Sequence, residues 1–153
     1  MKSLSADKIE LAKQGVDSCG GPFGALVVKD GKIISEAYNE VTHTNDPTAH
    51  AEVLAIRRAC KTLNTFDLSD CEIYSSCEPC PMCLGAIYWA RIKKLYHSST
   101  REDAENAGFD DSIIYREFEL KSKKKRLLTE RVILKKAYEP FILWKNKEDK
   151  ICY

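Results

Sequence analysis

The sequence lacks any apolar run long enough to cross a membrane, and it has no apolar N-terminal segment of the kind that directs secretion. It also lacks an excess of charge, because 24 basic and 23 acidic residues leave a formal net charge of +1. Such a balance provides no broad electrostatic attraction for nucleic acid. Repeats and low-complexity linkers are absent as well. We therefore expect no membrane partner and no nucleic acid bound through overall charge.

The composition is that of an ordinary globular protein. At 153 residues, of which 44% are hydrophobic, the chain is long enough for a single domain, residues 1–153, with a substantial core. Seven cysteines are an odd number and are unevenly spaced, which favours reduced thiols and a cytoplasmic location. Three of them, Cys19, Cys60 and Cys71, fall in apolar stretches, so we expect them to be buried and unreactive.

Two short motifs carry the chemistry of this sequence, His50-Ala51-Glu52 and Pro79-Cys80-Pro81-Met82-Cys83. One imidazole and two thiolates are three ligands for a tetrahedral zinc ion and leave the fourth position open for water, as in catalytic zinc sites. The Glu52 carboxylate supplies the proton transfer that such a water needs to attack a substrate. This combination of H-x-E with P-C-x-x-C is a known signature of the zinc nucleobase deaminases.

Other interpretations of the cysteines stay open. Cys77, Cys80 and Cys83 are evenly spaced, so they also suit a structural site or a redox pair. A structural zinc would need four protein ligands and would leave Glu52 without a role. We favour the catalytic zinc site and expect Cys77 to end a strand and to pack in the interior.

The first motif lies at a predicted helix start. Apolar residues at helical spacing predict a helix over 49–63, with Thr48 as its N-cap. Residues two apart do not share a face of a continuing helix. His50 and Glu52 therefore converge only if they lie in the first turn, facing a site beyond the helix end.

The second motif follows the same logic. Pro79 suits the first position of a helix, on which Cys80 and Cys83 lie one turn apart on one face. Two helix N-termini that point at one metal place partial positive charge beside the thiolates. The pKa of each cysteine falls as a result, which favours the deprotonated ligand form.

The remaining periodicity predicts alternating strands and helices. Strands are expected over 25–29, 32–38, 71–75 and 92–97, the first two joined by an Asp30-Gly31 turn. Further helices are expected over 4–19, from a Thr100–Asp103 capping box to 107, over 112–120 and over 140–147. Residues 127–134 suit either a strand or a helix. This order implies an α/β fold, a three-layer α/β/α sandwich with helices on both faces of a mixed sheet.

Longer segments resemble the cytidine deaminase superfamily, namely residues 20–25, 46–52 and 76–86. Within it, residues 86–91 and 108–112 resemble the small bacterial guanine deaminases, and 140–144 and the terminal Tyr153 extend the similarity over nearly the whole chain. The resemblance implies a five-stranded deaminase sandwich with Zn²⁺ as cofactor. Under it, His50, Cys80 and Cys83 hold the zinc, and Glu52 shuttles the proton.

The resemblance also implies a substrate-binding set: Asn39, Asp111, Phe23, Trp89, Ala51 and Tyr153. In that family an asparagine hydrogen-bonds the purine, a carboxylate reads its ring N–H groups, two aromatic residues wall the pocket, and a C-terminal tyrosine closes over it. Dimers of the family exchange C-terminal segments. We therefore expect a homodimer in which a segment of about residues 127–153 is exchanged between subunits.

Simpler structural roles fit the same positions. Asn39 suits a turn, and Asp111 suits a cap for the helix that begins near 112. Phe23 and Trp89 suit ordinary core packing, and a terminal Tyr153 is normally disordered. Only the resemblance favours the substrate-binding roles.

The predicted function is zinc-dependent hydrolytic deamination of a free nucleobase, guanine to xanthine and ammonia. The alternatives are a nucleoside such as guanosine, a tRNA adenosine, a related aminated heterocycle such as isocytosine, ammeline or another triazine, and a non-catalytic zinc module. The basic run over 121–126 would suit RNA phosphates, although we favour a solvated loop. The carboxylate within 108–112 suits a free purine with N–H donors, where tRNA enzymes carry glycine and alanine.

Overall fold

A computed structural model describes residues 2–121 and 124–153, with side chains described from residue 6 onward. The chain divides into two compact units, Met1–Ser112 and Ile113–Tyr153. Within the described residues, no helix has both the length and the apolar character needed to cross a bilayer. Ser122 and Lys123 of the predicted basic loop lie outside the described residues.

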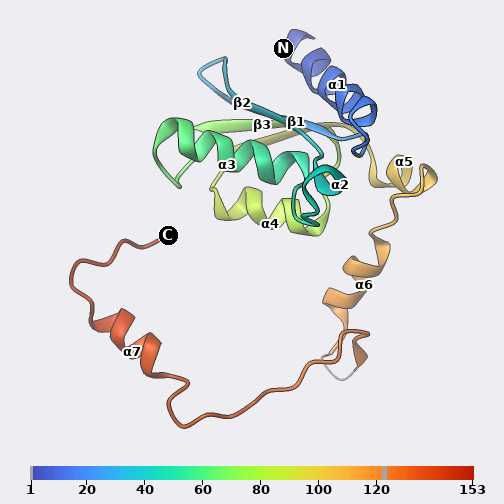
Figure 1. The fold of residues 1–153 in the computed structure, drawn as a ribbon. Helices are drawn as coiled ribbons and strands as arrows, with labels where there is room; N and C mark the ends of the chain where they lie inside the picture. The colour runs from blue at the N-terminus through green and yellow to red at the C-terminus, as the bar shows by residue number, and fades with distance from the viewer. Residues whose placement is uncertain (1, 122–123) are drawn as a thin grey trace. The chain divides into compact units, whose positions relative to one another are not determined.

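The first unit is built on a mixed sheet of four strands (Figure 1). They are β1 (Gly24–Lys29), β2 (Lys32–Tyr38), β3 (Cys71–Cys77) and β4 (Lys94–Ser99), in the order β2-β1-β3-β4. β1 pairs antiparallel with both β2 and β3, whereas β3 and β4 run parallel. The predicted α/β fold with a mixed sheet is confirmed.

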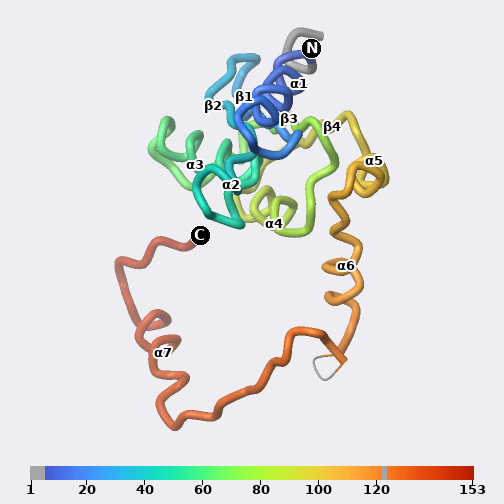
Figure 2. The backbone as a smooth tube through the Cα atoms, turned by 45° about the vertical axis from the view of Figure 1, so that its right-hand side comes forward, coloured from blue at the N-terminus to red at the C-terminus, as the bar shows by residue number. Residues whose placement is uncertain are grey.

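Helices cover both faces of this sheet (Figures 1 and 2). α1 (Lys2–Asp17) packs on one face, where Leu26 and Val28 of β1 join one apolar core. α3 (Ala51–Leu63) and α4 (Pro81–Trp89) pack on the other face, where Ala25 and Val27 join a second core. Because side chains alternate along a strand, β1 contributes to both cores, and it is buried over nearly its whole length.

Both site helices begin later than the sequence predicted. Thr48 is not the N-cap of α3, because its N–H and hydroxyl both donate to Asp46, at 2.8 and 2.7 Å, in a turn before the helix. His50 is the N-cap of α3 instead. Likewise Cys80 is the N-cap of α4, so Pro81 rather than Pro79 begins that helix. The ligand residues therefore lie at the helix ends themselves.

Other local predictions have mixed outcomes. α5 (Arg101–Asn106) begins with the predicted capping box between Thr100 and Asp103, with both hydrogen bonds formed. Cys77 ends β3 and is buried, as predicted. Cys71 is buried, but Cys60 is only partly buried and Cys19 is exposed, so the prediction for Cys19 is wrong. The short helix α2 (Val41–Thr44) was not predicted.

The second unit contains α7 (Glu139–Asn146) and nearly all of α6 (Ser112–Glu119). Residues 127–134 form neither strand nor helix, and their apolar side chains are exposed. A strand needs a neighbour for its backbone N–H and C=O groups, and this segment pairs with none of the described strands. The prediction of a fifth strand is therefore wrong for the described part of this single chain.

Candidate metal centre and active site

Three predicted ligands converge at the N-terminal ends of α3 and α4. His50 Nδ1 lies 3.6 Å from Cys80 Sγ and 3.5 Å from Cys83 Sγ. All three ligand atoms lie within 4.8 Å of one another, and no other group of three or more potential metal ligands is found among the described residues. The three ligands come together because His50 and Cys80 are the N-caps of α3 and α4, and Cys83 lies in the first turn of α4.

The two thiols differ in their pKa shifts, so the expected lowering of the pKa is found for Cys80 and is wrong for Cys83. The hydrogen bond from Cys83, together with the neighbouring His50, lowers the pKa of Cys80 to about 4. The same hydrogen bond, together with burial, raises the pKa of Cys83. The neighbouring groups thus favour the deprotonated form of Cys80, which is the form that binds a metal. One thiolate, a second thiol that metal binding deprotonates and one imidazole form the soft donor set of Zn²⁺, with one coordination position left for water.

Glu52 stands beside this group as the second residue of α3. Its side chain is buried, and the Ser75 hydroxyl of β3 donates to Oε1 at 2.8 Å. Burial raises the pKa of Glu52, so the carboxyl group holds its proton to higher pH than an exposed glutamate. A buried carboxyl group with a raised pKa next to a metal site is suited to accept a proton and to return it.

A cavity of about 300 Å³ opens beside these groups, within the size range of small-molecule sites. Its lining includes His50, Glu52 and Cys80. Phe23, Phe109, Asp110 and Asp111 line it as well. The cavity thus combines a metal centre and a proton carrier with aromatic walls and carboxylates.

Two of the predicted substrate residues, Asp111 and Phe23, line this cavity. Partial burial raises the pKa of Asp111. Asp111 is not the residue that holds the start of α6, because Asp110 Oδ1 accepts the Ser112 N–H at 2.8 Å. Asp110 rather than Asp111 therefore has the predicted structural role at the start of α6. That role does not account for the presence of Asp111 in the cavity lining.

The other predicted substrate residues lie elsewhere. Asn39 is buried, and its Oδ1 accepts the N–H groups of Gly21 at 3.4 Å and Val41 at 3.2 Å, which confirms the turn role. Ala51 is fully buried at the start of α3. Neither residue is among those that line the cavity.

The two remaining aromatic residues belong to different units of the chain. Trp89 lies at the end of α4, is 70% exposed and does not line the cavity. Tyr153 belongs to the second unit, where its ring centroid lies 6.5 Å from that of Trp144.

Sequence reasoning missed several residues that line the cavity. Phe109 is the clearest case, since its ring packs edge-to-face on Phe23 with centroids 5.0 Å apart. Glu78 and Arg101 also line the cavity, and the Arg101 N–H donates to Glu78 at 3.3 Å. The available signal was the short segment of residues 108–111, which places an aromatic residue two positions before Asp111.

Comparison with known proteins agrees with this geometry. Residues 2–99 match the family model for the cytidine and deoxycytidylate deaminase zinc-binding region. A guanine deaminase of Bacillus subtilis is 52% identical over 143 residues, which are 93% of this chain and 92% of the relative. A tRNA-specific adenosine deaminase of Aquifex aeolicus is 49% identical over 88 residues, 58% of each chain. An X-ray structure of guanine deaminase from Bacillus subtilis superimposes with a TM-score of 0.96 at 50% identity, covering 99% of this chain and 98% of the other.

Proposed function

The chain belongs to the cytidine and deoxycytidylate deaminase family of zinc-dependent hydrolytic deaminases, and we propose that its substrate is guanine as a free base, converted with water to xanthine and ammonia. The observation that carries this assignment is Asp111, which lines the cavity with Glu52 and lies beyond residue 99, where the family model ends. The alignment with the guanine deaminase spans 143 residues and so extends well into this later part of the chain.

The chemistry of the proposed reaction is divided among residues at the helix starts. His50, Cys80 and Cys83 hold zinc, which supplies Lewis-acid activation of a water molecule for attack on the amino-bearing carbon C2. Glu52 accepts the proton of the attacking water and delivers it to the ring nitrogen next to C2. It then takes the remaining proton from the oxygen added at C2 and gives it to the amino group. The C2–N bond breaks, ammonia leaves as a neutral molecule, and the oxygen on C2 becomes the carbonyl of xanthine. Ser75 holds the carboxyl group in place during both transfers.

The cavity walls orient the base. Asp111 accepts hydrogen bonds from ring N–H groups, and Phe23 bounds the flat ring system. Asn39 contributes through its amide NH₂, because its Oδ1 already serves two backbone N–H groups. A free guanine presents more ring N–H donors than a base attached to ribose, which is why the carboxylate favours the free base.

We further propose that the protein is a homodimer in which residues 127–153 pack on the partner subunit. Leu128 is 92% exposed and Ile133 is 80% exposed, and most other apolar residues of the second unit are exposed too. Exposed apolar surface of this extent favours burial against another chain. In such a dimer Trp89 and Tyr153, at 70% and 73% exposure in the single chain, complete the closed pocket. Cytoplasmic location is part of the same proposal.

A deaminase of tRNA adenosine is the second candidate, favoured by the 49% identity to the tRNA-specific enzyme. That similarity covers only 58% of this chain, whereas the similarity to the guanine deaminase covers 93%. Because zinc motifs are shared by both classes, the part of the chain beyond them decides between the two. We therefore place the free base ahead of the nucleic acid.

An ammonia-release assay on purified zinc-loaded protein tests the proposal. The panel comprises guanine, guanosine, adenine, cytosine, isocytosine, ammeline and a tRNA anticodon stem with an adenosine at the wobble position. We expect kcat/KM to be highest for guanine, with xanthine as the product and no turnover in Glu52→Gln. A higher kcat/KM for the anticodon stem or for guanosine would overturn the free-base assignment while leaving the zinc chemistry intact.

A further inference from the structure

Phe109 is an aromatic residue with its ring half-exposed in the wall of the active-site cavity. The side chain is 45% exposed in the single chain, although it is wholly apolar. It lies two residues before Asp111, so its position is tied to that of the proposed base-reading carboxylate. An apolar ring that lines a polar cavity and stays exposed offers its surface to a flat ligand.

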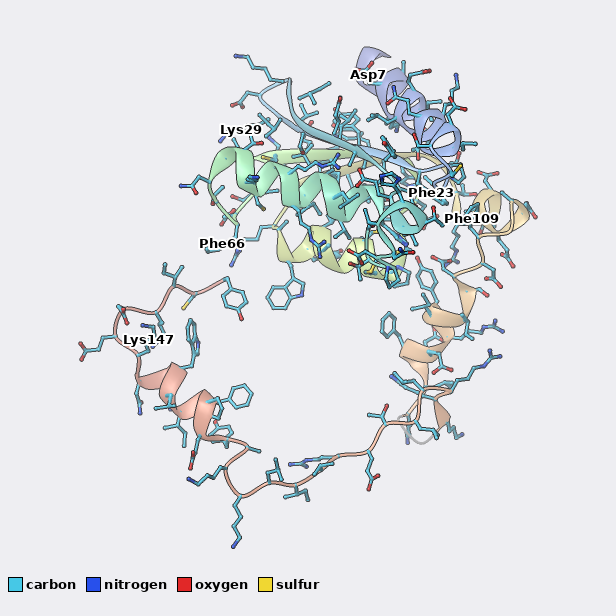
Figure 3. The ribbon with its side chains drawn as sticks, in the orientation of Figure 1. Asp7, Phe23, Lys29, Phe66, Phe109 and Lys147 are labelled. Carbon is cyan, nitrogen blue, oxygen red and sulfur yellow. The ribbon has the colours of Figure 1, made fainter. Side chains whose placement is uncertain are left out.

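The ring orientation is set by Phe23. The two centroids lie 5.0 Å apart with an interplanar angle of 85°, the edge-to-face arrangement that aromatic pairs prefer (Figure 3). Phe23 immediately precedes β1, and its backbone C=O accepts the Asn39 N–H at 3.0 Å. Phe109 thus packs against a residue anchored to the sheet rather than against another loop.

The backbone at Phe109 is fixed by the end of α5. The Phe109 N–H donates to the Ala104 C=O and the Gly108 N–H donates to the Glu105 C=O, both at 2.9 Å. With Gly108 at a φ of +94°, these two bonds form a Schellman motif, in which glycine adopts a conformation that other residues resist. The motif holds the ring of Phe109 at the cavity without help from the zinc helices.

A second, mostly apolar cavity of about 300 Å³ adjoins the active-site cavity. It is lined by α1 residues such as Ile9 and Val16, and it shares Phe23, Cys77, Ala104 and Phe109 with the active-site cavity. Both phenylalanines therefore line both cavities. Removing the Phe109 ring would take away a contact surface and would enlarge the space beside the active site.

We propose that Phe109 is a substrate-positioning residue, against whose ring the flat base stacks, and that it sizes the active-site cavity for a single base. This inference rests on the proposed function and names a residue that binds the substrate of that reaction. Stacking holds the base in the plane in which Asp111 reads its N–H groups and Glu52 reaches the ring. Binding, more than chemistry, is therefore the step that depends on Phe109.

Three variants at Phe109 separate stacking from space filling. Phe109→Ala should raise KM for guanine about tenfold, the effect of one base–aromatic stack, with a smaller change in kcat. Phe109→Tyr keeps a ring and should stay within about threefold of the parent, on the same stacking argument. Phe109→Leu restores apolar volume without a flat face and should resemble Phe109→Ala. Zinc content and Tm are measured for each protein, and they should stay close to the parent.

Phe66 provides the matched control. Its ring is 46% exposed, it follows α3, and Figure 3 shows it at the opposite end of that helix from Phe23 and Phe109. The Arg91 guanidinium lies 5.7 Å from the Phe66 ring centroid, and Phe66 lines neither cavity. Phe66→Ala should therefore leave both kcat and KM at the parent values.

Two results would overturn the proposal: an unchanged KM in Phe109→Ala, or full recovery of KM in Phe109→Leu, which would reduce the ring to a space filler. Failure of the proposed function is a separate result, namely that the parent protein does not turn over guanine. In that case the same variants are compared on the heterocycle of the panel that is deaminated. The proposal then stands if KM for that heterocycle depends on an aromatic ring at position 109, and it fails if KM does not.

Discussion

Glu52 and Ser75 are joined in the interior by a hydrogen bond of 2.8 Å, donated by the serine hydroxyl to Oε1 of the carboxyl group. Ser75 is 1% exposed and Glu52 is 5% exposed, so water does not compete for the bond. One residue comes from the first turn of α3 and the other from β3, between β1 and β4. The strand thus fixes the orientation of the proton carrier beside the zinc ligands.

Removing this hydroxyl should impair catalysis as well as stability. In Ser75→Ala, the buried carboxyl group loses a partner, which should lower the free energy of unfolding by about 1–3 kcal/mol. We expect kcat for guanine to fall about tenfold because the carboxyl group is no longer held, a cost of about 1.4 kcal/mol in the barrier. Steady-state kinetics and urea unfolding measure the two effects.

Ser76→Ala is the matched control for this prediction. Ser76 is also buried, and its Oγ accepts the Gly24 N–H at 3.0 Å, but it does not bond to Glu52. The control should lose stability with little change in kcat. Equal losses of kcat in Ser75→Ala and Ser76→Ala would show that Ser75 has no specific role in holding Glu52.

Glu52→Gln should keep the fold and the metal but lose turnover. Glutamine retains an oxygen that accepts from Ser75, yet its amide cannot carry the proton between water, ring and leaving group. We expect kcat to fall by at least about a hundredfold, the usual scale of general acid–base catalysis. The measurement is turnover normalised to zinc content. Substantial remaining kcat at full zinc occupancy would mean that another residue carries the proton.

The purified protein should contain one zinc per chain. Cys80→Ala or Cys83→Ala removes one of three ligands, and we expect zinc content to drop sharply in either variant. Elemental analysis by mass spectrometry after dialysis measures the occupancy. Cys71→Ala is the control, since Cys71 is fully buried but is not part of the ligand group. Parent-level zinc in Cys83→Ala would contradict the assigned ligand set.

Asp111→Ala should lower kcat/KM for guanine at least about tenfold, which corresponds to the loss of one or more hydrogen bonds to the base. Stability should change little, because Ser112 is bonded by Asp110 rather than by Asp111. A thermal melt and substrate kinetics on the same preparation test both statements. Normal guanine kinetics in this variant would show that the base binds in another orientation.

Asn39 requires a different substitution, because it has a structural role as well. Asn39→Ala would leave the Gly21 and Val41 N–H groups without their acceptor. Asn39→Asp keeps an oxygen acceptor and removes the NH₂ donor that we assign to the substrate. We expect kcat/KM of Asn39→Asp to fall at least about tenfold, a loss comparable to one hydrogen bond, with Tm near the parent. Parent-like kinetics in Asn39→Asp would limit Asn39 to its turn.

The C-terminal tail should act on the active site of the partner subunit. Deleting residues 151–153 should strongly lower guanine turnover, leave zinc content and Tm near the parent, and relax the rejection of guanosine. The reason is that a tail closed over the pocket excludes water and fills the space that a ribose needs. Unchanged kinetics of the truncated protein would show that the tail plays no part.

Mixing two inactive proteins tests the exchange itself. If tails are exchanged, a heterodimer of Glu52→Gln with the truncated chain places the intact tail of the first on the intact Glu52 site of the second. Coexpression of the two chains should therefore restore up to one active site per heterodimer. If each tail serves its own subunit, the mixture stays as inactive as its components. Light scattering on the same samples measures the dimer mass.

The zinc group and Glu52 could be predicted from sequence because helix geometry brings them together locally. His50 is the N-cap of α3 and Glu52 lies in its first turn, so both can face a site beyond the end of that helix. The exact start of α3 was not predictable in the same way. It depends on whether Thr48 caps the helix or bonds to Asp46, and these two local hydrogen bonds compete.

The opposite wall of the cavity could not be derived from local pattern. Phe23 and Phe109 meet only because the sheet and α5 bring distant parts of the chain together. Trp89 has the same aromatic character, but it lies on a face of α4 that is exposed in the single chain. The missing fifth strand has a similar cause, since 127–134 finds no pairing partner among the described strands. The hydrophobic pattern of residues 127–134 does not indicate whether a pairing strand would come from the same chain or from a partner.

The two hydrogen-bonded ends of α5 have a consequence for how this enzyme could be altered. A capping box at Thr100 and a Schellman motif at Gly108 let residues 100–109 hold their shape largely by bonds within the segment. The segment begins just after residue 99, where the match to the zinc-binding family model ends. A chimaera that takes residues 100–111 from a related deaminase would therefore replace Phe109 and Asp111 together and keep His50, Glu52, Cys80 and Cys83 unchanged.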